Sequence, residues 1–189
     1  MFLAHNIESL KNHALTQLNE IYSYYIDTKA AWNFVHRQVR ERGDVEFAVY
    51  DVETGKVLIS VEELAEKARG YTQIQLAETT FQQFISVFEM FFFDLLELWF
   101  NAKPEDLEDR PLDFSLVLNS VDKTGIIQCV VSDAVNKIKY QNPRDWFKKL
   151  NQLLKYKSVS DDEIEKLVEA KASRDILVHN QGIVNEIYG

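Results

Sequence analysis

The chain of 189 residues contains little cysteine, proline or glycine: one Cys, three Pro and six Gly. A single cysteine cannot form a disulfide within the chain, so a reducing cytoplasm is the expected setting. A chain of this length buries enough apolar surface to fold as one domain without disulfides or a metal ion. Cys129 stands among apolar neighbours in "GIIQCVVSDA", and we expect it to be a small buried hydrophobic residue.

The sequence also lacks the features of export and membrane segments. The first residues, "MFLAHNIESL", have neither the basic start nor the apolar stretch of a signal peptide. The most apolar run, "FISVFEMFFFDLLELWF", contains Glu89, Asp94 and Glu97, and a charged side chain at a bilayer centre costs about 3 kcal/mol. We therefore expect a buried helix and no membrane partner.

Positive charge is scarce, since the formal net charge is −9, and this opposes nonspecific binding to nucleic acid. Residues 137–157 are the exception: seven basic and one acidic side chain give them a net charge of +6, and four aromatic rings lie among them. Such a stripe can bind RNA phosphates and stack bases, although a charge run is more often a solvated helix face. The candidate substrate-binding lysines are Lys148, Lys149, Lys155 and Lys157.

The scarcity of helix-breaking residues indicates a mainly α fold. No Gly or Pro precedes Gly43, and apolar residues recur at steps of three and four over residues 7–25, which is typical of an amphipathic helix. Residues 72–101 also lack Gly and Pro. The second half of this segment is so apolar that a helix there must be buried on nearly every side. Because residues 84–100 are too apolar for one polar face to solvate, they also favour a homodimer.

Local signals predict where the last two helices begin. Asn142 followed by Pro143 is typical of an N-cap and the first helical position. Ser160 and Glu163 have the spacing of a capping box, which predicts a helix over residues 160–182.

A change of period between these helical segments predicts a small β-hairpin near residues 44–60. Apolar residues alternate in "VEFAVYD", and "ETGK" is a typical turn. A short helix then follows, with Ser60 and Glu63 as its capping box and Gly70 as a glycine stop.

The side chains best suited to catalysis lie in "RDILVH". Asp175 and His179 are four residues apart and share a helix face, whereas Arg174 is offset from His179 by about 140°. When RNA is cleaved by its own 2′-hydroxyl, an imidazole can transfer protons near neutral pH and a guanidinium can stabilise the phosphorane charge, without a metal ion. An Arg and a His at this spacing are more often a helix cap and an ion pair, and spacing alone favours that structural role.

The segment "EAKASRDILVHNQGIVNEIY" resembles the signature helix of the HEPN superfamily, in which four to six residues separate an arginine from a histidine and the first of these residues is polar. Here these positions are Arg174, Asp175 and His179. Asn180 and Tyr188 resemble residues in the tail of that motif. More loosely, "NPRDWFKKLNQLL" resembles the penultimate helix of such proteins.

The resemblance implies an up-and-down helical bundle, here a single domain of residues 1–189 with the 44–60 hairpin as an insertion. It also implies a homodimer in which two motifs face each other across a cleft. Many HEPN proteins are metal-independent endoribonucleases of toxin–antitoxin or other defence systems, and a nucleotidyltransferase-like protein is one expected antitoxin. Other members only bind nucleotides or partner proteins, so a noncatalytic interaction domain is the alternative.

What the resemblance implies for the site is a catalytic set of Arg174, Asp175 and His179, with Asn180 and Tyr188 binding substrate. Other chemistry has less support, because the four histidines show no metal-ligand spacing with one another and no glycine-rich phosphate loop follows a strand. We therefore expect neither a metal ion nor a cofactor.

Overall fold

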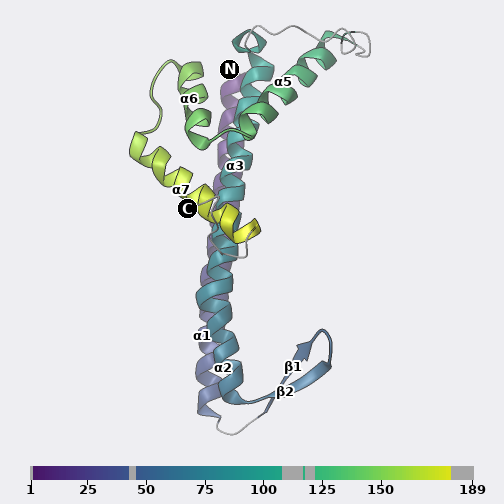
Figure 1. Ribbon diagram of the computed structural model, residues 1–189, viewed down its shortest axis with the longest axis vertical. Helices are drawn as coiled ribbons and strands as arrows, with labels where there is room; N and C mark the ends of the chain where they lie inside the picture. The colour runs from purple at the N-terminus through teal and green to yellow at the C-terminus, as the bar shows by residue number, and fades with distance from the viewer. Residues whose placement is uncertain (1, 43–45, 108–116, 118–121, 180–189) are drawn as a thin grey trace. The chain divides into compact units, whose positions relative to one another are not determined.

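The computed structural model describes residues 2–42, 46–107, 117 and 122–179 (Figure 1). The chain divides into two compact units, one of residues 1–16 with 85–189 and one of residues 17–84. The long helices α1 (Phe2–Glu41) and α3 (Leu76–Ala102) each contribute to both units. The predicted mainly α class with one β-hairpin is confirmed.

The hairpin belongs to the unit of residues 17–84. Strands β1 (Phe47–Asp51) and β2 (Gly55–Ile59) pair antiparallel, with Phe47 opposite Ile59 and Asp51 opposite Gly55. The Asp51 carboxylate accepts hydrogen bonds from the backbone N–H groups of Glu53 and Thr54, and these bonds hold the pKa of Asp51 below its usual value. Gly55 supplies the positive φ of 79° that closes the turn.

The predicted glycine stop at Gly70 is wrong. Helix α2 (Val61–Gly70) begins at the predicted capping box, in which Ser60 and Glu63 exchange hydrogen bonds. Gly70 has an ordinary helical φ of −56°, and the chain continues through a π-helical turn, η1 (Tyr71–Gln75), into α3. Because the glycine is not in the left-handed conformation that ends a helix, α2 and α3 form one continuous helical segment.

The hydrophobic core of the other unit is built on the second half of α3. Helices α5 (Lys123–Lys139), α6 (Pro143–Leu154) and α7 (Asp161–His179) lie beside this part of α3 in Figure 1. Trp146 of α6 is 1% exposed, and its ring centroid lies 4.8 Å from that of Phe93 and 5.7 Å from that of Phe92. The other buried residues of this core are Leu96, Phe100, Val131, Val135, Ile138, Phe147 and Ile164.

The apolar run that favoured a homodimer is therefore largely covered within its own unit. Phe92, Leu96 and Phe100 are each no more than 2% exposed, and Met90 is 45% exposed. The run does not need a second copy of the chain to remove its apolar surface from water. The expectation of a homodimer now depends on the resemblance alone.

A 3₁₀ turn, η2 (Pro104–Asp106), follows α3 and is fixed by a hydrogen bond of 2.7 Å from Trp99 Nε1 to Asp106 Oδ2.

Cys129 is exposed, contrary to expectation. The buried face of α5 is formed by Val131 and by residues at steps of three and four from it, so that the side chain two positions earlier faces the other way.

Candidate functional site

Helices α6 and α7 begin where the sequence predicts. The side chain of Asn142 accepts a hydrogen bond from the backbone N–H of Arg144, 2.9 Å away. Ser160 and Glu163 form the predicted capping box, and the bonds from Ser160 lower the pKa of Glu163. Helix α7 is described as far as His179, so the predicted end at residue 182 lies outside the described residues.

The last three turns of α7 carry a charge network, which we define as Glu89 of α3 with Lys171, Arg174 and Asp175 of α7. Arg174 Nη2 donates a hydrogen bond to Glu89 Oε2. Lys171 Nζ lies 3.4 Å from Glu89 Oε1 and donates a 2.9 Å hydrogen bond to Asp175 Oδ2. The four side chains are only 16–23% exposed, and Lys171 Nζ also lies 5.9 Å from the ring centroid of Trp146. Partial burial makes these ion pairs stronger than pairs at a free surface.

Within the charge network, Arg174 has its charge compensated by two carboxylates. Its Nε lies 3.3 Å from Asp175 Oδ1, yet this N–H is buried and donates no hydrogen bond within the described part of the chain. The distance alone shows an electrostatic contact, whereas the bond to Glu89 has hydrogen-bond geometry. The guanidinium is thus held by Glu89, and its buried Nε–H has no hydrogen-bond acceptor among the described residues.

His179 is separate from this network. It is exposed, and helix geometry places it about 7.5 Å along the axis and about 140° around it from Arg174. The oxygens of Asp175 face Lys171 and Arg174, and between residues 122 and 179 no hydrogen bond joins Asp175 to His179. The structure therefore brings Arg174 and Asp175 together, and within residues 122–179 no hydrogen bond or ion pair joins His179 to either of them.

The remaining two residues of the predicted motif, Asn180 and Tyr188, lie outside the described residues.

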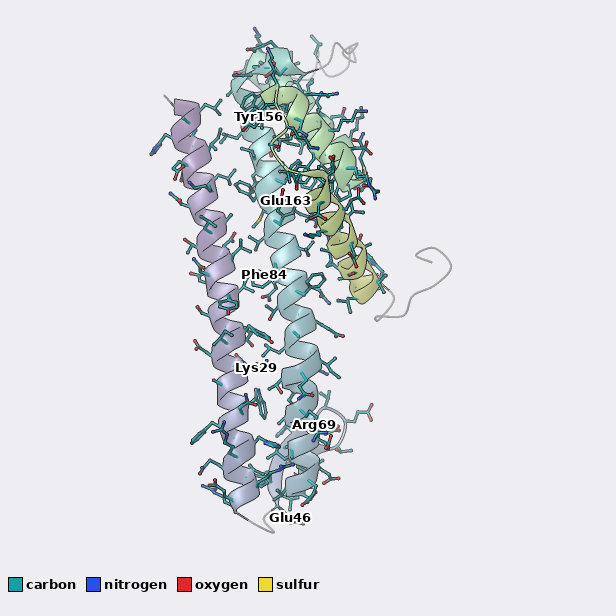
Figure 2. All side chains as sticks on the ribbon, turned by 90° about the vertical axis from the view of Figure 1, so that its left-hand side faces the viewer. Lys29, Glu46, Arg69, Phe84, Tyr156 and Glu163 are labelled. Carbon is teal, nitrogen blue, oxygen red and sulfur yellow. The ribbon has the colours of Figure 1, made fainter. Side chains whose placement is uncertain are left out.

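A basic groove of about 640 Å³ lies along α6, α7 and the turn between them. Figure 2 labels Tyr156 on this turn and Glu163 in the first turn of α7. Lys148, Lys155 and Lys157 line the groove, as do Arg144, Gln152 and Tyr156. The fourth predicted lysine, Lys149, lines a different cavity of about 120 Å³ beside Phe100.

Two features fix the turn at the edge of the basic groove. Asn151 Oδ1 accepts hydrogen bonds from the backbone N–H and the hydroxyl of Ser158, at 2.9 and 2.8 Å. Lys155 ends α6 with a φ of 59°, a left-handed conformation that lysine rarely adopts. The turn therefore presents Tyr156, which is 62% exposed, from a defined backbone.

Half of the cations of the basic groove are already paired. Arg144 forms two hydrogen bonds with Glu165, which raise the pKa of Arg144 and lower that of Glu165. Lys157 Nζ lies 2.7 Å from Asp161 Oδ2. Lys148 and Lys155 have no ion-pair partner among the described residues, so they are the cations most available to a phosphate.

Helix geometry gives the position of the basic groove relative to His179 and Arg174. Glu165 and His179 are fourteen residues apart, so they lie about 40° apart around α7 and about 21 Å apart along it. Glu165 and Arg174 are nine residues apart and lie about 180° from each other. The groove side of α7 therefore continues to His179, whereas Arg174 is on the side that faces Glu89 of α3.

Glu89 of the charge network is not part of the motif, but the sequence gives a signal for it. Glu89 interrupts a run of apolar residues, and a carboxylate kept in such a run needs a cationic partner. The partners, Lys171 and Arg174, lie more than 80 residues further along the chain and could not be chosen from the sequence alone.

No protein-family model, curated protein or solved structure matches the chain. Among residues 2–42, 46–107, 117 and 122–179, none of the helices is long and apolar enough to cross a membrane. The same described residues contain no group of three or more His, Cys, Asp or Glu side chains arranged to hold a metal ion.

Proposed function

We propose that the chain is a metal-independent endoribonuclease of the HEPN type. In the proposed reaction His179 removes the proton from a ribose 2′-hydroxyl, and O2′ attacks the adjacent phosphorus. The bond from phosphorus to O5′ breaks, and O5′ takes up a proton. The products are a 2′,3′-cyclic phosphate and a free 5′-hydroxyl. Arg174 stabilises the charge on the phosphorane.

The observation that carries this proposal is the contrast between Arg174 and His179. Arg174 is 16% exposed and held by Glu89, so its positive charge is fixed in place before substrate binds. His179 is exposed at the end of the same helix, where an imidazole can exchange protons with a bound ribose. A fixed cation and an accessible titratable group are what cleavage by the 2′-hydroxyl needs.

The basic groove supplies a path for the RNA strand. Lys148 and Lys155 can hold phosphates while the exposed ring of Tyr156 stacks on a base. The groove lies about 21 Å along α7 from His179, a distance that several nucleotides of single strand can span. Single-stranded RNA is therefore the proposed substrate.

Because Arg174 and His179 lie on different sides of α7, a homodimer suits the proposal. Two copies of the motif facing each other across a cleft would allow Arg174 of one copy and His179 of the other to reach the same phosphate. A cytoplasmic toxin controlled by an antitoxin, such as a nucleotidyltransferase-like protein, is the setting that the resemblance implies.

A cleavage assay on purified protein tests the proposal. Single-stranded RNA incubated with EDTA and the protein should yield 2′,3′-cyclic phosphate ends, identified by mass spectrometry. His179→Ala should abolish them, while His13→Ala, which removes another exposed histidine, should not. Cleavage that persists in His179→Ala would refute the assignment. Paired loss of Lys148 and Lys155 should weaken RNA binding and flatten its salt dependence.

The second candidate is a noncatalytic domain that binds a nucleotide or partner protein. The charge network favours it, because an arginine occupied by Glu89 is what a purely structural role requires. Under this alternative no cyclic phosphate forms, and His179→Ala changes neither RNA integrity nor thermal stability.

A further inference from the structure

The unit of residues 17–84 contains a polar cavity that the proposed ribonuclease reaction does not use. It has a volume of about 260 Å³ and lies between α1 on one side and α2 with the π-helical turn η1 on the other. Helix α1 contributes Trp32, Asn33, His36 and Arg40, and the opposite side contributes Ala68, Arg69, Thr72 and Gln73. Figure 2 labels Arg69 on α2. We call this the arginine cavity.

The arginine cavity is open to solvent and has a cationic lining. The α1 residues recur at steps of one, three and four, as do those opposite, so each set forms one face of its helix. Ala68 and Thr72 are buried at the base of the cavity, whereas Arg40 and Arg69 are exposed to solvent. The two faces carry two guanidinium groups, an imidazole and two amides, and no acidic side chain lines the cavity.

The nearby acidic residues do not neutralise these cations strongly. Arg69 is 3.4 Å from Glu66, but both side chains are more than half exposed, and such a pair contributes little. Glu41, the neighbour of Arg40 in sequence, accepts a hydrogen bond from Gln38. Arg40 has no ion-pair partner within the described residues 2–42 and 46–107.

The walls of the arginine cavity are well defined. The ring centroids of Trp32 and Tyr71 are 5.5 Å apart, which braces α1 against the start of η1. Thr72 is 7% exposed, and its hydroxyl donates a 2.8 Å hydrogen bond to the carbonyl oxygen of Ala68. Isolated π-turns are rare and frequently occur at functional sites.

We propose that the arginine cavity binds a phosphate group. Two arginines from separate helices can each present a fork of N–H donors to phosphate oxygens, and Asn33, His36 and Gln73 can supply further donors. The volume is slightly below the usual range for ligand pockets, so it suits a phosphate or a small phosphate monoester rather than a dinucleotide. This site is independent of the motif on α7.

Calorimetric titration with inorganic phosphate, adenosine 5′-monophosphate and adenosine tests the proposal. It also distinguishes free phosphate from a phosphate monoester as the ligand. Phosphate should bind with a dissociation constant in the range of about 1 mM or below. Tighter binding of the monophosphate would identify a phosphate monoester as the ligand, and equal binding would identify free phosphate. Binding of adenosine as tight as that of the monophosphate would overturn the proposal.

Variants locate the binding. Arg40→Gln combined with Arg69→Gln should weaken phosphate binding at least about tenfold, since each charge-assisted hydrogen bond contributes more than 1.4 kcal/mol. Arg37→Gln removes an exposed arginine of α1 that does not line the cavity and should change affinity less than about twofold. Equal losses in both proteins, or no binding at about 10 mM phosphate, would overturn the proposal.

Two further variants test the guanidinium forks and the independence of the two sites. Arg40→Lys combined with Arg69→Lys keeps both charges but loses the planar fork, so it should bind phosphate with intermediate affinity. Binding equal to that of the unchanged protein would show that the forks are not used. The ribonuclease proposal is tested separately, because His179→Ala should bind phosphate as the unchanged protein does. Loss of binding in His179→Ala would instead assign the phosphate to α7.

Discussion

Replacing Glu89 with Gln removes one negative charge from the charge network while keeping the size of the side chain. In the folded protein Glu89 compensates two cations, Lys171 and Arg174. After the substitution only Asp175 remains to balance both. Two partly buried cations that share one carboxylate repel each other and are poorly solvated, so the folded state should be destabilised.

The size of the effect follows from the burial of the network. Exposed ion pairs contribute about 0.2–1 kcal/mol. Removing one partner of a fully buried pair costs about 3–5 kcal/mol. Glu89 is 19% exposed and Arg174 is 16% exposed, so the expected loss lies between these limits, at about 2 kcal/mol. For a chain of this length that loss corresponds to a decrease in melting temperature of roughly 4–8 °C.

Thermal melts of Glu89→Gln and Glu97→Gln measure this effect with a matched control, since Glu97 is an exposed glutamate on the same helix. The control should change stability by no more than about 0.5 kcal/mol. A double-mutant cycle between Glu89→Gln and Arg174→Gln should give a coupling energy of about 1 kcal/mol or more. Equal melting temperatures for the two glutamate variants, or additive losses in the cycle, would refute the reasoning.

Three further predictions concern single positions. Lys155→Gly should raise the free energy of unfolding by about 0.5–1 kcal/mol, because glycine adopts the left-handed conformation without strain; a lower urea midpoint would contradict this. Gly70→Ala should also stabilise by about 0.5–1 kcal/mol, since the added Cβ meets no atom within 4 Å, and a decrease in melting temperature would count against a helical Gly70. The hydrogen bond from Arg144 lowers the pKa of Glu165 in the folded state, so this pair stabilises the fold above the unfolded pKa of about 4.3. The stabilisation is lost as pH falls through the lower folded pKa. Glu165→Gln should therefore make the melting temperature depend less on pH between about 5 and 3, and an unchanged slope would refute this.

Features that depend on neighbouring residues in sequence were predicted well. The capping boxes at Ser60 and Ser160 and the N-cap at Asn142 are all present, because each needs only side chains within three residues of each other. The hairpin turn after Asp51 was equally local. Such signals give the class of the fold but not the packing of its helices.

Features that depend on tertiary contacts were not predictable. Apolar neighbours suggested that Cys129 is buried, but the face that α5 turns toward α3 decides its exposure. Gly70 has the sequence of a helix stop, yet the residues after it continue the helix. For the candidate site, the resemblance pointed to Arg174 and Asp175, whereas the carboxylate that holds Arg174 lies 85 residues earlier in the chain, on another helix.

The π-turn after Gly70 has a consequence for how the chain tolerates changes in length. In a π-turn each N–H bonds to the carbonyl five residues earlier, so the turn holds more residues than an α-turn. It therefore changes which way the side chains of α2 point around the helix axis relative to those of α3. Deleting one residue from Tyr71–Gln75 would turn α2 by about 100° relative to α3 and carry Arg69 away from α1. Substitutions at exposed positions such as Gln75 leave the rotation of α2 relative to α3 unchanged. In this segment the number of residues constrains the structure more tightly than their identity.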